Sequence, residues 1–458
     1  MGKLFGTDGV RGVVGESLTP ELALRLGRAI GAYFGKGARV LVGRDVRAGG
    51  AMIECALTAG LLAEGVRVYS AGLLPTPALQ YGVKSLGFDG GVMITASHNP
   101  PEYNGVKVIA ADGIEIPRED EKIIEDYYFR GVSSSLPWRE YAYNPQVRAD
   151  VLETYINAIV DMVDSDLIRR AGLKVVVDCA NSVGSLATPE VLRRLGVKAL
   201  TLNCNLNPEF PGREPEPTVE SLRVAAETVK IYGADFGVGH DGDADRAIVI
   251  TDEGEVIWGD RSGTLLTEFS AEEWRELPRR TYTGVSSSIL VEQYLNPLGI
   301  KVVWTPVGSV VISRMIQRDG GAISGFEENG GYMHVPHHIV RDGAMTTALM
   351  AYMLAKERGS LSEKVKKLPR YYPIKTKIPM NRERALCAVE AVKKYYSGYR
   401  QVTIDGVKVI GDDFWVLVRP SGTEPVLRIM LEARSKEKAE KLLEEVKRAI
   451  DESCGPRR

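Results

Sequence analysis

Short apolar runs alternate with longer amphipathic stretches along most of the chain. The β-branched runs at residues 39–42 and 174–177 each end beside a glycine or an aspartate, as strands commonly do. Residues 20–34 and 436–451 carry apolar side chains at helical spacing, and Thr19 is placed to cap the first of these helices. This alternation predicts an α/β fold, with mostly parallel sheets covered by helices.

The length of the chain, 458 residues, exceeds that of one compact domain, so several domains are expected. Three segments carry boundary signals: the Ser-, Pro- and aromatic-rich residues 133–145, the turn after the apolar run that ends at Ile250, and the proline-containing residues 368–379. These signals divide the chain into predicted domains over residues 1–150, 151–252, 253–368 and 369–458.

The overall charge narrows the range of partners. Lys and Arg total 58 against 60 Asp and Glu, a formal net charge of -2, so no global field draws the protein to nucleic acid or to an anionic membrane. The first residues lack the apolar core of a signal peptide, and no run reaches the ~18 apolar residues of a membrane span. We therefore expect a cytoplasmic protein with no nucleic-acid or membrane partner.

The five cysteines are odd in number and scattered, and no two form a Cys-x-x-Cys pair. This distribution argues against a disulfide framework and against a zinc site. We expect reduced, buried or idle thiols at these positions, which are Cys55, Cys179, Cys204, Cys387 and Cys454.

A dense group of reactive side chains follows the apolar run at residues 92–94. Ser97 and His98 are adjacent there, and Lys107 lies ten residues beyond Ser97 in a segment rich in turn-forming residues. A serine with nearby proton acceptors and a lysine is suited to nucleophilic or phosphoryl chemistry at the end of a strand. The alternative is that Ser97 and Asn99 only make the hydrogen bonds of a turn.

Asp241, Asp243 and Asp245 stand at alternate positions between apolar segments. Carboxylates this close repel one another unless a cation lies among them, and such hard oxygen ligands suit Mg²⁺ or Ca²⁺. The segment is not an EF-hand, because Arg246 occupies the position where that motif needs glycine. A solvated acidic loop is the alternative reading.

Two further loops carry polar groups at candidate binding positions. Glu327 and Asn329 lie in a glycine-rich stretch that can contact sugar hydroxyls, although such residues also make ordinary turns. The second loop combines hydroxyls, backbone amides and guanidinium groups, as a phosphate dianion requires, and its alternative is a capped turn with surface arginines. Its residues are Arg419, Ser421, Gly422, Thr423 and Arg428.

Signatures of other enzyme classes are missing. The sequence has no P-loop, no Gly-x-Gly-x-x-Gly that follows a strand and opens a helix, no His-Glu-x-x-His and no Gly-x-Ser-x-Gly. The sequence therefore offers no motif in support of a kinase, dehydrogenase, zinc protease or esterase function.

Taken in order, the four loops resemble those of the α-D-phosphohexomutase family, which includes phosphoglucomutases, phosphomannomutases and phosphoglucosamine mutases. The resemblance covers nearly the whole chain. It implies a four-domain phosphohexomutase architecture: three similar α/β domains and a smaller C-terminal α+β domain around a central cleft, each contributing one loop.

The resemblance also implies roles for individual residues. Ser97 is similar to the serine that is phosphorylated in the active enzyme, and with the three aspartates it would contact Mg²⁺. His98, Lys107 and Arg11 match positions that assist catalysis near this serine. The residues that match substrate-binding positions are Arg246, Glu327, Asn329, Arg419, Ser421, Gly422, Thr423 and Arg428.

Three positions depart from the pattern of the family. Ala244 replaces a usual glycine in the metal loop, a change that we expect to be harmless. Asn329 replaces the usual serine of the sugar loop, and Gly331 replaces the histidine that follows it. These two departures bear on the contacts to the sugar, and hence on which sugar phosphate is preferred.

The combined reading is a Mg²⁺-dependent phosphohexomutase, an isomerase that interconverts hexose 1-phosphate and hexose 6-phosphate. The resemblance implies a phosphoserine enzyme, a hexose 1,6-bisphosphate intermediate and activator, and possible homo-oligomers. Phosphomannomutase/phosphoglucomutase activity is the first expectation and phosphoglucosamine mutase activity the alternative. A noncatalytic sugar-phosphate binding protein is the alternative from another class, and it predicts that Ser97→Ala has no effect.

Overall fold

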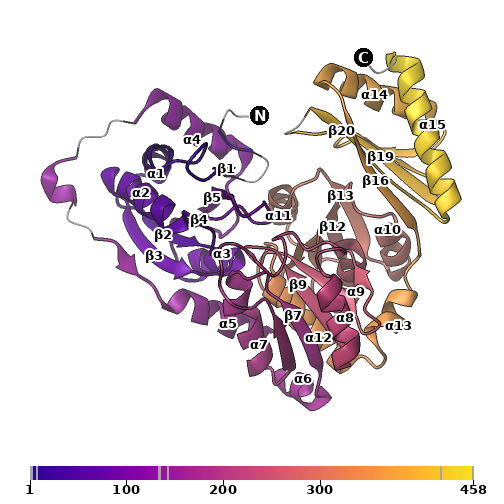
Figure 1. The fold of residues 1–458 in the computed structure, drawn as a ribbon, viewed down its shortest axis with the longest axis horizontal. Coiled ribbons are helices and arrows are strands. Elements are labelled where there is room, and N and C mark those ends of the chain that lie inside the picture. Colours follow the sequence, from indigo (N-terminus) through magenta and orange to yellow (C-terminus); the bar gives the residue numbers. More distant parts are fainter. Residues whose placement is uncertain (1–3, 7–8, 133–135, 142–143, 423–424, 456–458) are drawn as a thin grey trace.

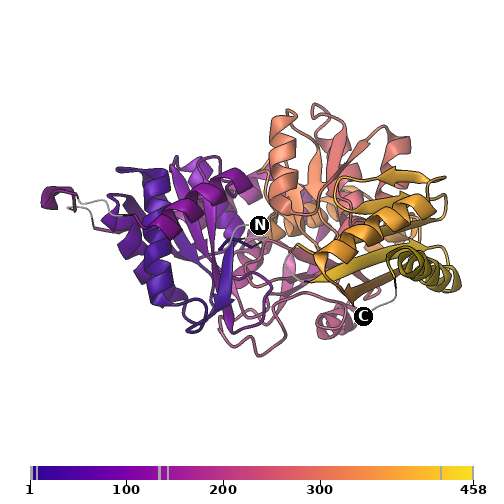
Figure 2. The same ribbon diagram turned by 90° about the horizontal axis from the view of Figure 1, so that it is seen from above.

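The computed structural model describes residues 4–6, 9–132, 136–141, 144–422 and 425–455. These residues form four sheets that follow one another along the sequence, and each sheet carries its own helices (Figure 1). Seen from above, the first sheet with its helices lies at one end of the molecule and the fourth sheet at the other (Figure 2). The predicted α/β class is confirmed.

The first sheet has the strand order β1-β5-β4-β2-β3-β6. Strands β2, β3, β4 and β6 are parallel, whereas β5 and β1 run antiparallel to their neighbours. The predicted helix over residues 20–34 is α1, and Thr19 accepts a hydrogen bond from Leu22 N as its N-cap. The elements are β1 Val10–Val13, α1 Pro20–Phe34, β2 Arg39–Arg44, α2 Gly50–Ala63, β3 Arg67–Leu73, α3 Thr76–Ser85, β4 Gly90–Ile94, β5 Tyr103–Ala110, α4 Arg118–Arg130, a 3₁₀ turn Trp138–Tyr141 and β6 Gln146–Val147.

The second and third sheets repeat the central motif of the first. Their orders are β11-β10-β9-β7-β8 and β13-β12-β14-β15. The elements of the second are α5 Asp150–Met162, α6 Ser165–Ala171, β7 Lys174–Asp178, a 3₁₀ turn Val183–Leu186, α7 Thr188–Arg194, β8 Lys198–Leu202, α8 Arg223–Tyr232, β9 Phe236–His240, β10 Ala247–Thr251 and β11 Val256–Ile257. Those of the third are α9 Gly259–Glu273, β12 Arg280–Gly284, α10 Leu290–Leu295, a 3₁₀ turn Asn296–Leu298, β13 Lys301–Thr305, α11 Ser309–Arg318, β14 Ser324–Phe326, β15 Tyr332–His334, α12 Gly343–Lys356 and α13 Leu361–Lys366.

The shared motif has three parallel strands and one antiparallel return strand. In each case the last parallel strand leads directly into the return strand: β4 into β5, β9 into β10 and β14 into β15. The connecting loop therefore lies at the carboxyl end of a parallel strand, where α/β sheets present functional groups. All three of the predicted loops in this part of the chain occupy that connection.

The fourth sheet is antiparallel throughout, with the order β16-β20-β19-β18-β17. Helices α14 and α15 contribute apolar side chains to one face, so this part is the expected α+β unit. Its elements are β16 Tyr372–Pro379, α14 Arg382–Tyr395, β17 Arg400–Val402, β18 Val407–Ile410, β19 Phe414–Pro420, β20 Val426–Ala433 and α15 Lys436–Cys454.

Apolar packing joins the first three sheets and leaves the fourth with a core of its own. One continuous buried cluster contains Leu79 beside β2, Val177 of β7 and Phe326 of β14. The core of the fourth sheet is separate and includes Val416 and Leu442. A small cluster around Trp415 and Val285 joins the fourth sheet to the third. Among the described residues, none of the helices is long and apolar enough to cross a membrane.

Two disulfides correct the expectation drawn from the cysteines. Cys179 and Cys204 are bonded just beyond β7 and β8, and Cys387 of α14 is bonded to Cys454 at the end of α15. Cys55 is free and exposed. The sequence prediction of reduced thiols was wrong because these partners lie 25 and 67 residues apart, and only the fold brings them together.

A thiol count tests these two bonds. Alkylation of the protein in denaturant without a reductant is expected to modify Cys55 alone, whereas all five cysteines react after reduction. Intact-protein mass spectrometry reads both numbers. The unreduced sample is prepared aerobically and quenched in acid. If more than one of its cysteines is modified, the two assigned disulfides are wrong.

Lys408 gives the contact between the third and fourth sheets a pH dependence. Its ammonium group is buried between the rings of Trp304 and Trp415, 3.7 and 4.3 Å from their centroids. Burial lowers the pKa of Lys408 to about 7, and the nearby Glu432 only partly opposes this effect. The unfolded chain, with the ordinary lysine pKa of 10.5, therefore binds this proton more tightly than the native state does.

Lys408→Met is expected to change how stability depends on pH. The unfolded state holds the additional proton between the two pKa values, so the stability of the wild type rises relative to that of the variant as the pH increases from about 7 to about 9.5. Thermal unfolding of both proteins at the two pH values measures this. A difference in melting temperature that is constant with pH contradicts it.

Candidate active site

Ser97 lies in the loop between β4 and β5 and is fully buried. Its Oγ donates a hydrogen bond of 2.7 Å to Asp241 Oδ2, across from the second sheet. The residue has a left-handed backbone with φ of 51°, which costs a non-glycine residue free energy and recurs at functional sites. Its amide donates to Thr95 Oγ1 at 2.8 Å, which helps to hold this conformation.

Arg47 holds the loop of Ser97 from beneath. Its guanidinium donates to four backbone carbonyls, at distances of 2.6 to 2.9 Å. Its Nε lies 3.3 Å from the buried carboxylate of Asp45. The four carbonyls belong to Ser97, Asn99, Pro100 and Tyr103. Sequence reasoning missed Arg47, because nothing in the sequence around residues 45–47 signals a guanidinium that reaches residues 97–103.

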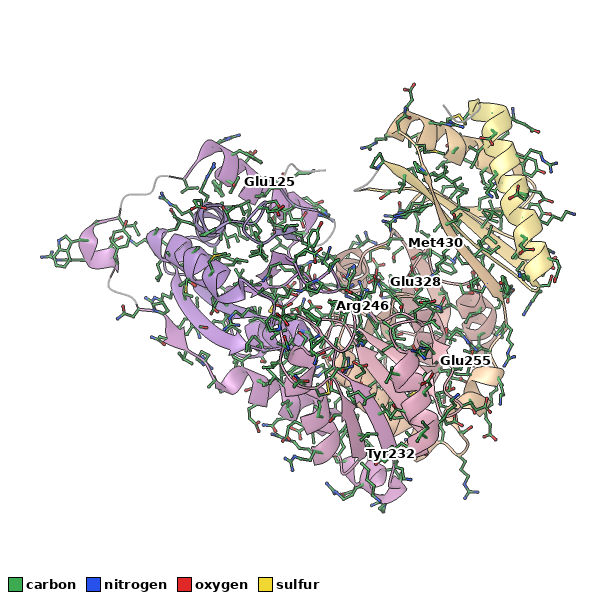
Figure 3. The ribbon with its side chains drawn as sticks, viewed as in Figure 1. Glu125, Tyr232, Arg246, Glu255, Glu328 and Met430 are labelled. Atoms are coloured by element: carbon green, nitrogen blue, oxygen red, sulfur yellow. A yellow bond between two sulfur atoms is a disulfide. The ribbon has the colours of Figure 1, made fainter. Side chains whose placement is uncertain are left out.

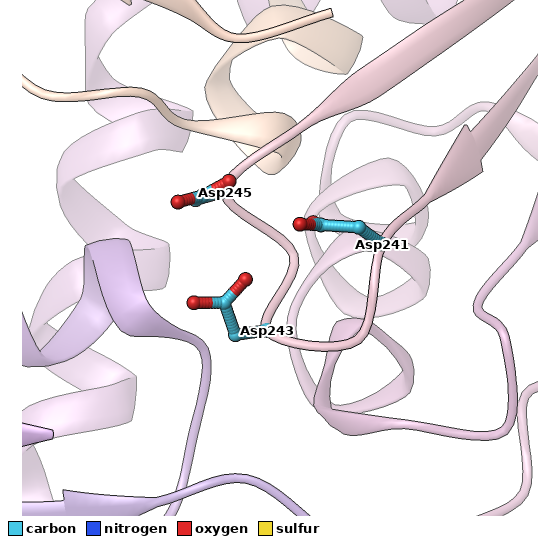
Figure 4. Close-up of side chains that lie close together, drawn as sticks. All are labelled: Asp241, Asp243 and Asp245. Atoms are coloured by element: carbon cyan, nitrogen blue, oxygen red, sulfur yellow. The ribbon is translucent and has the colours of Figure 1, made fainter. Parts of the chain in front are cut away.

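The three aspartates converge at the loop between β9 and β10 (Figure 4). They are buried, and one carboxylate oxygen from each lies within 4.8 Å of the others. Burial, followed by the charges of Asp245 and Asp243, raises the pKa of Asp241 well above its ordinary value. Asp245 Oδ1 is buried with no hydrogen-bond partner among the described residues. A divalent cation with oxygen ligands fits this donor set and would relieve the repulsion.

Three cationic side chains surround the aspartates. Lys107 Nζ lies 3.2 Å from Asp243 and 3.5 Å from Asp245, and it also lies 3.5 Å from Glu115. Arg246 Nε is 3.8 Å from Asp241, and the guanidinium of Arg341 pairs with Asp245. The predicted lysine is thus in the site, although Lys107 belongs to the first sheet and the aspartates to the second. Arg341 was not predicted.

His240, the residue before Asp241, fixes the base of this loop. Its Nδ1 lies 2.8 Å from Arg246 O and carries the hydrogen of that bond, so Nε2 accepts from Thr188 Oγ1 at 2.9 Å. Burial lowers the pKa of His240 to about 4, so the ring is neutral at physiological pH. Its role is therefore to hold the loop.

His98 and Arg11 complete the surroundings of Ser97. Arg246 Nη2 lies 3.0 Å from His98 Nδ1, and that same nitrogen is 3.4 Å from Ser97 Oγ. Arg11 of β1 donates to the carboxamide of Asn99. The structure therefore brings the predicted group around Ser97 together from two sheets.

Glu327 of the third sheet joins the same network. Its carboxylate lies 3.1 Å from Arg341 Nη1, and the guanidinium of Arg341 also contacts Asp245. Asn329 accepts a hydrogen bond from Gly331 N at 3.2 Å, which shapes the loop itself. The neighbouring Glu328 accepts from Ser286 Oγ at 2.7 Å.

The fourth loop stands apart from this network, on the hairpin of β19 and β20 at the upper right of Figure 1. Arg419 and Arg428 are directly opposite each other in the sheet, and Lys377 of β16 is opposite Arg428 on the other side. Like charges in such positions are unfavourable unless an anion or a carboxylate lies near them. Arg419 pairs with Asp405 at 2.7 Å.

The other predicted residues of this loop are only partly described. Ser421 donates its amide to Val426 O at 2.9 Å, and Gly422 follows it at the exposed turn. Thr423 lies outside the described residues. Lys377 was not predicted as part of this site. Only the pairing of β16 with β20 places it opposite Arg428, and no motif in the sequence indicates that pairing.

Comparison with known protein families matches all four parts of the chain. The models of the four phosphoglucomutase/phosphomannomutase domains match residues 2–134 (alpha/beta/alpha domain I), 153–254 (domain II), 258–372 (domain III) and 376–449 (C-terminal domain). The chain belongs to the phosphoglucomutase/phosphomannomutase family. It is therefore a phosphohexomutase, an isomerase, and the first interpretation of its sequence is confirmed at this level.

Individual relatives span nearly the whole protein. A phosphoglucosamine/phosphogalactosamine mutase of Sulfurisphaera tokodaii is 52% identical over 456 residues, covering 98% of this chain and 100% of that protein. A phosphoglucomutase/phosphomannomutase of Thermococcus kodakarensis is 42% identical over 449 residues, covering 97% of each. The crystal structure of a family protein from Burkholderia thailandensis superposes with a TM-score of 0.86 at 26% identity, covering 98% and 97% of the two chains.

Ala244, at the position of the usual family glycine, has a left-handed backbone with φ of 58°. This conformation costs a residue with a Cβ atom roughly 1 kcal/mol, so the substitution carries a small strain that the sequence alone did not indicate.

Arg47→Met is expected to lower mutase activity by at least about tenfold, because it leaves four backbone carbonyls without their donor and the buried Asp45 carboxylate without its cation. Arg44→Met is the matched control, since Arg44 ends β2 three residues before Arg47 and pairs with Glu54 at 2.9 Å. Initial rates and circular dichroism of both variants measure the effect. Equal activity of the two variants shows that the clamp is dispensable.

Proposed function

We propose that this phosphohexomutase acts through a phosphorylated Ser97 and that its principal substrates are hexosamine phosphates. The hydrogen bond of 2.7 Å between Ser97 Oγ and Asp241 supports the first part, because it places the hydroxyl among the carboxylates and the cations of the network. The relative from S. tokodaii, 52% identical over nearly the full length, supports the second part.

The reaction balances as two phosphoryl transfers. In the first, the P–O bond to Ser97 Oγ breaks as a bond forms from phosphorus to a free sugar hydroxyl. The hydroxyl proton passes to a base, and Ser97 Oγ takes up a proton as it leaves. The sugar bisphosphate then turns, and its other phosphoryl group returns to Ser97, whose hydroxyl gives up its proton while the sugar oxygen that is released takes one up. No ATP is consumed, and a hexose 1,6-bisphosphate is the expected activator of unphosphorylated enzyme.

The side chains divide this work by their positions. Asp241, Asp243 and Asp245 would hold Mg²⁺, which when bound stabilises negative charge on phosphoryl oxygens. Lys107 and Arg246 hold positive charge beside the phosphoserine, which carries about -1.5 to -2 charges. His98 Nδ1, 3.4 Å from Ser97 Oγ, is a candidate to move the proton.

The fourth loop is suited to the phosphate that is not being transferred. Arg419, Arg428 and Lys377 form a row across three strands, so an anion lying over them relieves their mutual repulsion. Glu327, held by Arg341, offers carboxylate oxygens to the hydroxyl or ammonium groups of the sugar. The two ends of the substrate are thereby recognised by different domains.

Phosphorus NMR tests the activity and the choice of sugar together. Protein with Mg²⁺ and a trace of hexose 1,6-bisphosphate is mixed with the 1-phosphates of glucosamine, galactosamine, glucose or mannose in parallel tubes. We expect 6-phosphate signals to grow fastest with a hexosamine, and Ser97→Ala to remove them, because its side chain cannot carry the phosphoryl group.

The outcomes of this experiment separate the parts of the proposal. Faster turnover of glucose or mannose 1-phosphate overturns the hexosamine preference and leaves the phosphoserine mechanism standing. Full activity of Ser97→Ala overturns that mechanism. Turnover that persists in excess EDTA rejects the need for a divalent cation.

A further inference from the structure

Arg341 connects two loops that come from different sheets. It lies just before α12, and its side chain is only 6% exposed. One nitrogen of its guanidinium pairs with Asp245 of the metal loop, and the other lies 3.1 Å from Glu327 Oε2 of the sugar loop. Since a guanidinium presents its donors in a fixed fork, the two carboxylates are held in a defined relation to each other.

Gly331 leaves the space that Arg341 occupies. A Cβ atom built on Gly331 would lie 2.2 Å from Arg341 Cδ and 2.8 Å from its Cγ. These distances are far below van der Waals contact, so a side chain at residue 331 and the observed position of Arg341 exclude each other.

The backbone beside Arg341 is anchored on the metal loop. Asp342 caps α12 by accepting from Met345 N at 2.9 Å, and it accepts from Tyr155 OH at 2.6 Å. Gly343 N donates to Ala244 O at 3.2 Å, and a Cβ on Gly343 would lie only 2.6 Å from Arg246 O. Residues 341–343 are therefore held to the metal loop at two points, by the backbone of Gly343 and by the guanidinium of Arg341.

We propose that Arg341 is a positioning residue of the sugar site, made possible by the absence of a side chain at Gly331. It orients the Glu327 carboxylate for the hydroxyl or ammonium groups of a hexosamine phosphate and fixes that carboxylate relative to Asp245. This inference rests on the proposed function. Residues 331 and 341 thus act together, because the Arg341 side chain occupies the space that a side chain at residue 331 would need.

The test is a double-mutant cycle on Gly331→Ala and Arg341→Met. Arg341→Met is expected to lower kcat/KM about 10- to 100-fold, because a charge-assisted hydrogen bond and an ion pair are lost. Gly331→Ala is expected to cause a similar loss, since its methyl group displaces the arginine. The double variant is expected to be no worse than Arg341→Met alone, because the displaced group is already absent.

Two further variants separate positioning from general destabilisation. Arg341→Lys keeps the charge without the fork and is expected to recover only part of the activity. Arg318→Met changes an exposed arginine of the same domain, paired with Asp319, and is expected to match the wild type. Melting temperatures accompany all rates, so that a variant which fails to fold is recognised and replaced by Arg341→Lys in the cycle.

A binding measurement distinguishes failure of this inference from failure of the proposed function. Calorimetric titration of glucosamine 6-phosphate into Ser97→Ala, with and without Arg341→Met, gives a dissociation constant that does not depend on turnover. We expect about 10-fold weaker binding without the arginine. Equal affinity, or a double variant whose loss is the product of the two single losses, overturns the role of Arg341. Absence of turnover in the wild type refutes the proposed function instead.

Discussion

The mutual repulsion of three buried aspartates is the constraint on which the site depends. Asp241, Asp243 and Asp245 lie in one short loop with almost no access to water, and charges in such surroundings need partners. The described cations come from three sheets: Lys107 from the first, Arg246 from the second and Arg341 from the third. Their three positive charges equal the three aspartates in number, although Lys107 and Arg341 are also shared with Glu115 and Glu327. A divalent metal ion and a phosphoserine dianion, if both are bound, would add almost no net charge to this group.

This balance explains why the first three domains pack as one body. A chain of alternating charges runs from Glu115 through Lys107, Asp245 and Arg341 to Glu327, and it passes from the first sheet to the third. Arg246, labelled in Figure 3, lies 4.0 Å from Asp245 of this chain. The apolar cluster beneath it is equally continuous. Moving any of these domains separately would expose both the cluster and unpaired charges.

Local patterns in the sequence were sufficient to predict the fold class and part of the candidate site. The helix at residues 20–34, the class of the fold and the aspartates at alternate positions follow from periodicity and spacing. Arg47, Arg341 and the cysteine pairs were missed because their meaning depends on contacts between residues distant in the sequence, such as the 50 residues between Arg47 and the Ser97 carbonyl. The sequence marks Gly331 only as a departure from the family pattern. Its contact with Arg341 could not be predicted, because the two residues are close in space and ten positions apart in the chain.

The separate core of the fourth domain has a consequence for how such enzymes diversify. Its sheet and two helices enclose their own apolar residues, and the cluster around Trp415 is a small contact with the rest. Mutations on the β19–β20 hairpin can therefore accumulate without disturbing the metal loop. Recombination that exchanges this domain between relatives is expected to yield folded chimeras, so that under the proposed function recognition of the distal phosphate evolves independently of the chemistry at Ser97.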